Sequence, residues 1–217
     1  MIINKPKFWD HNVSFFSLIL LPFTLFFLLA IELRRFLIRP SQFNIPIICV
    51  GNIYVGGTGK TPTAIFLAKE LLKLRKNPVI IRKFYKSHSD EHNLIKENFD
   101  RLIICKNRKD GINEAIKKNY DVVILDDGFQ DYAIKKNINI ICFNQNQKIG
   151  NGLLMPSGPL REGLRSLQSA NIIIINGEKN DEFEKKILDI NKNLKIYYSN
   201  YRPFEFESLK SKKIFAI

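Results

Sequence analysis

The feature that most constrains the fold is a glycine-rich segment directly after a short apolar run. Residues 45–50 read IPIICV, and residues 51–62 continue as GNIYVGGTGKTP. A buried strand, a glycine loop ending in Lys-Thr and a helix together form the arrangement of a phosphate-binding loop. Backbone N–H groups of such a loop converge on phosphate oxygens, the lysine reaches the β- and γ-phosphates, and the threonine hydroxyl binds Mg²⁺. The segment therefore predicts a nucleotide-binding α/β fold.

We expect this loop to bind ATP, with Lys60 also acting in catalysis and Thr61 in metal binding. The strict pattern would place glycine at Tyr54, so the match is a variant. It is close to the loop of the membrane-associated partitioning ATPases, except that Val55 stands where their signature lysine would be. An ordinary glycine-rich turn is the alternative, but it does not explain Lys60 and Thr61 together. The predicted nucleotide contacts are Tyr54, Val55, Gly56, Gly57, Thr58, Gly59, Lys60 and Thr61.

Two adjacent carboxylates follow a second apolar run. Residues 121–127 read DVVILDD, which is typical of a strand that ends at a magnesium site behind a phosphate-binding loop. We expect Asp126 to hold Mg²⁺ and Asp127 to orient the lysine or the acceptor hydroxyl. A turn or a helix cap is the alternative. Residues 191–194, NKNL, lack the aspartate of the guanine-recognition motif, which favours ATP over GTP.

The remaining apolar runs alternate with polar helical stretches such as residues 110–118. This rhythm predicts a P-loop NTPase-type, mainly parallel sheet flanked by helices. In such a sheet the ligand lies at the carboxyl ends of the strands, where Lys60 and Asp126 are both expected. The predicted further strands are residues 78–81, 102–105, 138–143, 171–175, 194–197 and 213–217.

An uncharged segment precedes this domain. Val13–Ile31 contains no charged residue, and at roughly 1.5 Å per residue a helix of this length approaches the thickness of the bilayer core. Arginines follow it, which favours a cytoplasmic location for the rest of the chain. A signal peptide and a buried core helix are the alternatives. We therefore expect residues 1–40 to form a membrane-associated helix with a basic flank, and residues 41–217 to form the P-loop core domain.

The composition adds a strong positive charge. The formal net charge of +13 favours anionic partners such as phosphorylated lipid, an anionic membrane face or nucleic acid. The lysines are scattered as short pairs, without a dense basic run and interleaved aromatics, which does not favour nucleic acid. A solvated lysine-rich surface remains the simplest interpretation. The three cysteines have no metal-ligand spacing.

Three stretches together resemble one family. They are residues 50–62 (VGNIYVGGTGKTP), residues 125–130 (LDDGFQ) and residues 150–162 (GNGLLMPSGPLRE). Their order and combination are similar to the tetraacyldisaccharide 4'-kinases, inner-membrane enzymes of lipid A biosynthesis. The resemblance implies transfer of the γ-phosphate of Mg·ATP to the 4'-hydroxyl of a tetraacyl disaccharide 1-phosphate. It also implies a place on the cytoplasmic face of the inner membrane of a Gram-negative-type bacterium.

The resemblance also implies roles for individual residues. Asp126 and Asp127 would serve Mg²⁺ and catalysis. Residues 89–91, Ser-Asp-Glu, resemble the family's Gly-Asp-Glu, so Asp90 is the candidate base; an exposed polar loop is the alternative. Arg161 and Glu162 would grip phosphate or shape the nucleotide pocket, unless they are ordinary surface residues. Which carboxylate takes the proton stays open.

The chain departs from the family pattern at three places. Residues 81–86, IRKFYK, stand where the family has S-R-G-Y-G, and Asp131 stands where it has histidine. The sequence given stops where the family continues into a smaller C-terminal domain, so we expect that domain to be absent. Phosphoryl transfer depends on positioning and charge stabilisation, so such a loss would slow it. A catalytically impaired remnant and a membrane-associated partitioning-type ATPase switch are therefore the alternatives to an active lipid kinase.

Overall fold

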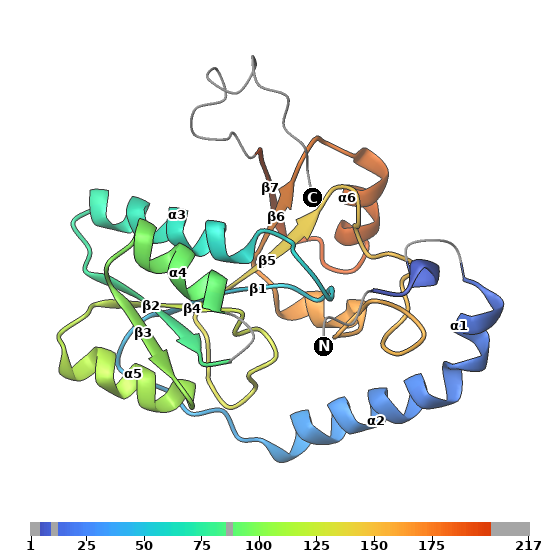
Figure 1. Ribbon diagram of the computed structural model, residues 1–217, viewed down its shortest axis with the longest axis horizontal. Helices are drawn as coiled ribbons and strands as arrows, with labels where there is room; N and C mark the ends of the chain where they lie inside the picture. Colours follow the sequence, from blue (N-terminus) through green and yellow to red (C-terminus); the bar gives the residue numbers. More distant parts are fainter. Residues whose placement is uncertain (1–4, 10–12, 86–88, 201–217) are drawn as a thin grey trace.

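The fold is built on one parallel sheet with helices on both faces (Figure 1). The computed structural model describes residues 5–9, 13–85 and 89–200. The strands are β1 (Ile47–Gly51), β2 (Pro78–Lys83), β3 (Leu102–Cys105), β4 (Val122–Asp126), β5 (Ile138–Asn144), β6 (Ile172–Asn176) and β7 (Lys195–Ser199). The α-helices are α1 (Phe15–Ile19), α2 (Leu21–Leu37), α3 (Lys60–Lys73), α4 (Ser89–Asn98), α5 (Arg108–Lys117) and α6 (Asp181–Leu188). Short 3₁₀ turns are η1 (Lys7–Trp9) and η3 (Leu164–Ser169).

The strands lie in the order β3-β2-β4-β1-β5-β6-β7, and each pair is parallel. β1 lies at the centre between β4 and β5, so the loop after β1 emerges beside the end of β4. The predicted parallel α/β fold is confirmed, and seven predicted strands lie within two residues of the observed bounds. The strand predicted at 213–217 lies outside the described residues.

Two apolar layers cover the sheet because neighbouring strand residues point to opposite faces. Val50, Ile80 and Ile124 pack with Ala64 of α3 and Ile95 of α4 on one face. The other face carries their strand neighbours together with α5, α6 and η3, and α2 contributes partly buried side chains there. Continuous apolar strands such as β4 are explained by this coverage of both faces.

The turn from β1 into α3 depends on two glycines. Gly59 precedes α3 with φ 82°, a left-handed conformation that glycine adopts without steric cost. A Cβ at Gly51 would lie 2.6 Å from Cβ of Phe129, so only glycine permits this approach of the loop that follows β4. The glycines of the motif therefore fix the loop and also its distance from the two aspartates.

The N-terminal apolar segment forms two helices, not one. α1 ends before Leu20, and α2 begins at Leu21 with Pro22 in its first turn, where proline costs no helical hydrogen bond. Within the described residues, no helix has both the length and the apolarity to cross a membrane. The membrane association expected of residues 1–40 therefore stays a prediction, as does the division into two domains.

Candidate active site

A pocket of about 310 Å³ lies over the glycine loop. It is lined by residues 57–62 together with Glu91, Leu94, Asn144 and Asn176. The positive end of α3, which begins at Lys60, faces it, and helix N-termini of this kind attract phosphate groups. Tyr54, Val55 and Gly56 do not line this pocket among the described residues, so the part of the predicted loop that meets it is 57–61.

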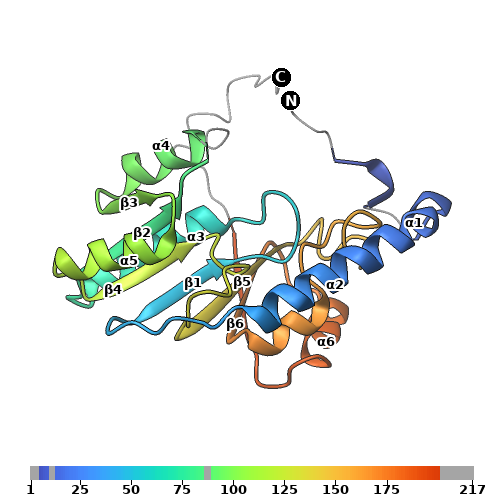
Figure 2. The same cartoon turned by 90° about the horizontal axis from the view of Figure 1, so that it is seen from below.

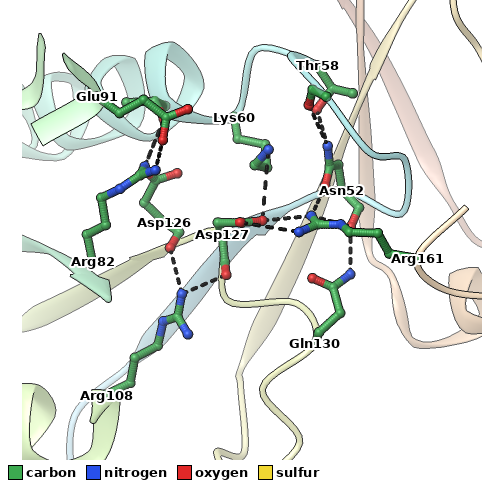
Figure 3. A network of polar contacts seen from close by, with 12 residues as sticks. Asn52, Thr58, Lys60, Arg82, Glu91, Arg108, Asp126, Asp127, Gln130 and Arg161 are labelled. Atoms are coloured by element: carbon green, nitrogen blue, oxygen red, sulfur yellow. Dashed lines mark hydrogen bonds and ion pairs between the residues drawn. The ribbon is translucent and has the colours of Figure 1, made fainter. Parts of the chain in front are cut away.

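Lys60 lies against the second aspartate. Its Nζ is 3.9 Å from Oδ1 of Asp127 (Figure 3). Burial lowers the pKa of Lys60, and the Asp127 carboxylate only partly opposes this. A desolvated ammonium group gains strongly from a new anionic partner. Lys60 is therefore suited to stabilise charge on a bound phosphate.

Asp126 and Thr61 form the predicted metal pair. Oγ1 of Thr61 is 3.0 Å from Oδ2 of Asp126, whose side chain is fully buried. Burial raises the pKa of Asp126, and the nearby Arg82 guanidinium opposes this shift. Among the described residues Oδ1 of Asp126 has no hydrogen-bond partner. A buried carboxylate oxygen without a donor, beside a hydroxyl, fits Mg²⁺ carried by a nucleotide.

Asp127 is held by Arg161 in a bidentate contact. The two distances from the guanidinium are 2.8 and 3.3 Å, and Asp127 has φ 54°. This left-handed conformation is one that aspartate and asparagine tolerate better than most residues. Burial works to raise the pKa of Asp127, but the hydrogen bond and charge of Arg161, with Lys60 and Arg108, outweigh it and lower the pKa to about 2. Asp127 is thus an anion at neutral pH.

Asn52 connects the loop to these groups (Figure 3). Its side-chain amide donates to Oγ1 of Thr58 at 2.8 Å, and Arg161 donates to its amide oxygen. Gln130 donates to its backbone carbonyl at 2.8 Å. One buried side chain therefore ties the phosphate-binding loop, Arg161 and the segment after β4 into one network.

The segment 150–162 lies alongside the start of the glycine loop. Tyr54 pairs with Leu160, and the Val55 N–H donates to the Pro159 carbonyl at 2.9 Å. Tyr54 is fully buried, contacts Lys5, and is not among the residues with positive φ. Glycine is therefore not needed at this position, which explains the departure from the strict motif.

Asp90 lies in the first turn of α4 with an exposed side chain, so it is helical and not part of a polar loop. Its neighbour Glu91 forms an ion pair with Arg82, which also contacts Asp126. Glu91 lines the pocket over the loop. The structure thus places Asp90 near that pocket, next to Glu91, while the role of base stays a prediction.

Glu162 points away from the nucleotide loop. It is 1% exposed, accepts from the Tyr132 hydroxyl, and forms an ion pair with Arg35 of α2. Burial raises the pKa of Glu162, with Tyr132 and Arg35 opposing the shift. The two neighbours expected in the nucleotide pocket therefore have different surroundings: Arg161 contacts the loop, and Glu162 contacts α2.

Three functional candidates were missed in the sequence. Arg82 contacts Asp126 and Thr61, Arg108 donates to the carbonyls of Asp126 and Asp127 at 3.2 and 2.7 Å, and Asn176 donates to the Thr58 carbonyl at 2.5 Å. Each lies at the end of a strand or the start of a helix at the carboxyl edge of the sheet. This position was the available signal, because ligands of parallel sheets bind at that edge.

A parallel sheet with this loop, the Thr61–Asp126 pair and the Lys60–Asp127 pair defines a P-loop nucleotide-binding protein. Comparison with known families goes further. The model of the tetraacyldisaccharide-1-P 4'-kinase family matches residues 16–216. The chain belongs to this family.

Individual relatives agree. A tetraacyldisaccharide 4'-kinase of Pelagibacter ubique is 41% identical over 95% of this chain and 66% of its own length. One of Shewanella sediminis is 33% identical over 86% of this chain and 63% of its own. The chain thus spans slightly less than two thirds of the length of these relatives.

Solved structures show the same fold. A crystal structure of LpxK from Aquifex aeolicus, described as in complex with ATP, aligns with a TM-score of 0.65 and 28% identity. It covers 74% of this chain and 58% of that one. A signal recognition particle 54 kDa protein from Aeropyrum pernix, with GDP, aligns with a TM-score of 0.52 at 10% identity over 90% of this chain and 50% of its own. The latter shows the fold alone.

Proposed function

We propose that this protein is an ATP-dependent lipid kinase that phosphorylates the 4'-hydroxyl of a tetraacyl disaccharide 1-phosphate in lipid A biosynthesis. The observation that carries the proposal is the pairing of Thr61 with Asp126 and of Lys60 with Asp127 at the mouth of the loop, in a chain of this family. The partitioning-type ATPase is not favoured by that membership.

The phosphates of ATP would occupy the pocket over residues 57–62. The relative from Aquifex aeolicus is described as in complex with ATP, which supports the same nucleotide here. A larger, mostly apolar cavity of about 540 Å³ adjoins this pocket, and Pro62 and Asn176 line both. The cavity also has Tyr197, Tyr198 and Asn200 in its wall, so it suits the flat adenine ring.

Mg²⁺ would be held by Thr61 and Asp126 together with phosphate oxygens. When bound, it supplies charge neutralisation on the transferred phosphate. Lys60 then stabilises the γ-phosphate, and Arg161 keeps Asp127 ionised beside it. The proton of the acceptor hydroxyl goes to Asp90 or to a carboxylate of the Asp126–Asp127 pair.

The acceptor would arrive from the membrane. The outer side of α1 and α2 exposes a continuous set of large apolar side chains, and a helix face of this kind binds the bilayer interface. Both helices would therefore lie on the cytoplasmic face of the inner membrane of a Gram-negative-type bacterium. The exposed residues are Phe15, Phe16, Leu18, Ile19, Leu21, Phe23, Leu25, Phe26, Leu29, Leu33, Phe36 and Leu37.

The test is transfer of radiolabelled γ-phosphate from Mg·ATP to a tetraacyl disaccharide acceptor in detergent. Lys60→Ala should reduce labelling by about 10²- to 10³-fold, because it removes the cation that stabilises the γ-phosphate. Lys69→Ala is the matched control, since Lys69 lies exposed on the same helix. Absence of labelled lipid while ATP still binds would reject the kinase and favour an impaired remnant.

A further inference from the structure

A second polar cavity lies apart from the glycine loop, at the C-terminal end of α2. Its volume is about 480 Å³, large enough for a small polar headgroup. Of the described residues that line it, four are cationic and none is acidic. The cationic residues are Arg35, Lys135, Lys136 and Arg165.

The four charges are unequally compensated. Arg35 is paired with Glu162, while Lys135 contacts the neutral Gln42 at 3.3 Å and Lys136 donates to the Phe129 carbonyl at 3.0 Å. Burial lowers the pKa of Lys136, and the charges of Asp131 and Glu162 only partly oppose this shift, so its ammonium group would gain from a further anion. The wall of this cavity is therefore positive, with room for an anionic group.

A buried hydroxyl in the same wall supports a ligand. Ser166 is 5% exposed, and among the described residues its Oγ has no hydrogen-bond partner. Buried hydroxyl groups are normally paired. A hydroxyl beside cationic side chains is a common arrangement for contacting phosphate oxygens.

The position of the cavity suggests where the ligand comes from. Its wall includes Ile38 and Pro40, which directly follow α2, and residues before β5 and β6. Arg35 in the last turn of α2 lines the same cavity as these residues, and Figure 2 shows α2 running from α1 towards the chain that leads into β1. The outer side of α2 is the apolar face that we assign to the bilayer. Headgroups would therefore lie within reach of the cavity when α2 is docked.

We propose that the cavity of Arg35, Lys135, Lys136, Arg165 and Ser166 binds the phosphate group of an anionic lipid at the membrane face. Basic cavities beside membrane helices recognise anionic headgroups through this chemistry. The phosphate can belong to a bilayer phospholipid or be free in solution. Binding of a phosphate that belongs to a membrane lipid rests on the proposed docking of α1 and α2 on the bilayer, whereas recognition of the phosphate group itself does not.

The test compares two variants of equal charge. Lys135→Gln combined with Arg165→Gln removes two exposed charges of the cavity. Lys96→Gln combined with Lys117→Gln removes two exposed lysines on α4 and α5, which lie towards the β3 side of the sheet (Figure 2). Both proteins and Ser166→Ala are tested for flotation with vesicles of phosphatidylcholine, alone and with phosphatidylglycerol. Calorimetry with inorganic phosphate and glycerol phosphate forms the soluble arm.

We expect the cavity pair to lose about tenfold or more in affinity for the anionic vesicles, and the control pair to lose about twofold or less. Binding to neutral vesicles should stay unchanged in both, because it reports the docking of α1 and α2. If the protein binds phosphate in solution and Ser166→Ala abolishes this binding, the site is also supported. Free phosphate is then enough to occupy the cavity without a membrane. Equal losses in the two pairs, with no effect of Ser166→Ala in either arm, would overturn the proposal. If the wild-type protein does not bind neutral vesicles at all, the proposed docking of α1 and α2 on the membrane is rejected instead.

Discussion

The carboxyl edge of the sheet buries charged side chains, whereas the outer side of the N-terminal helices exposes large apolar ones. At the edge, the charged groups Asp126, Arg82 and Arg108 are almost completely buried, and each has charged or polar partners within the chain. On the helices, Phe26 and Phe36 are 76% and 86% exposed although they are apolar. The edge is organised for a small ligand, whereas the helices present a surface that water does not favour.

The inner side of the same helices shows that their position is specified. Thr24 contacts Oγ of Ser157 at 2.7 Å, and Asn151 donates to Oγ of Ser17 at 3.2 Å. Both Ser17 and Thr24 are buried. Buried polar groups are normally paired in this way, so these hydrogen bonds hold the inner side of α1 and α2 against the rest of the protein. The apolar outer side therefore faces away from the protein.

The largest expected effect concerns the edge. Asp127→Asn should lower the rate of phosphate transfer by about 10²- to 10³-fold, because Arg161 and Lys60 lose their shared anion. Asparagine also tolerates φ 54°, so the backbone should be unchanged. The rate and the affinity for ATP would be measured beside Asp121→Asn, a control at the other end of β4. A rate equal to that of the control would show that Asp127 does not act in the reaction.

A smaller effect should appear in the free energy of unfolding at acidic pH. The pKa of Asp127 is lowered from 3.8 to about 2. A depressed carboxylate pKa adds stability above its unfolded value, and that stability is lost as the pH falls through the folded value. The contribution should be about 2 kcal/mol, present above pH 3.8 and lost by about pH 2. Urea unfolding of the wild type and of Asp127→Asn should therefore differ above this window and converge below it. A constant difference across the window would contradict the assignment.

The fold and the centre of the site were predictable because their signals are local. A continuous apolar run, a glycine loop and Lys60–Thr61 occur within 17 residues of sequence, 45–61, and Asp126 and Asp127 directly follow the apolar run 122–125. The bounds of β3 were predicted without error, since Leu102–Cys105 is a short apolar run with polar neighbours. Parallel pairing then brings these segments to one edge without further information.

The contacts that the sequence did not reveal join distant segments. Arg82 and Asp126 are 44 residues apart, and Arg35 and Glu162 are 127 apart. Neither has a spacing that helix or strand periodicity can report. The resemblance to the family assigned Glu162 to the nucleotide pocket together with Arg161, yet adjacent residues after an extended segment can face different sides. The break before α2 likewise has no unambiguous signal in the sequence, since a proline such as Pro22 is accepted in a first turn as well as at a kink.

The smallest expected effect separates the two sides of α2. Phe26→Ser combined with Phe36→Ser should change the free energy of unfolding in water by less than about 0.5 kcal/mol, because both rings are exposed and the two residue types have similar helix propensity. On the inner side, Thr24→Val should cost roughly 1–3 kcal/mol, since the Ser157 N–H and hydroxyl lose their partner. Denaturant unfolding gives both values, and flotation with neutral vesicles gives the second readout. The phenylalanine pair should weaken vesicle binding about tenfold or more, although it leaves folding unchanged. If the pair instead destabilises the protein as much as Thr24→Val does, the outer side of α2 is covered by protein in solution, and the contrast between the two regions disappears.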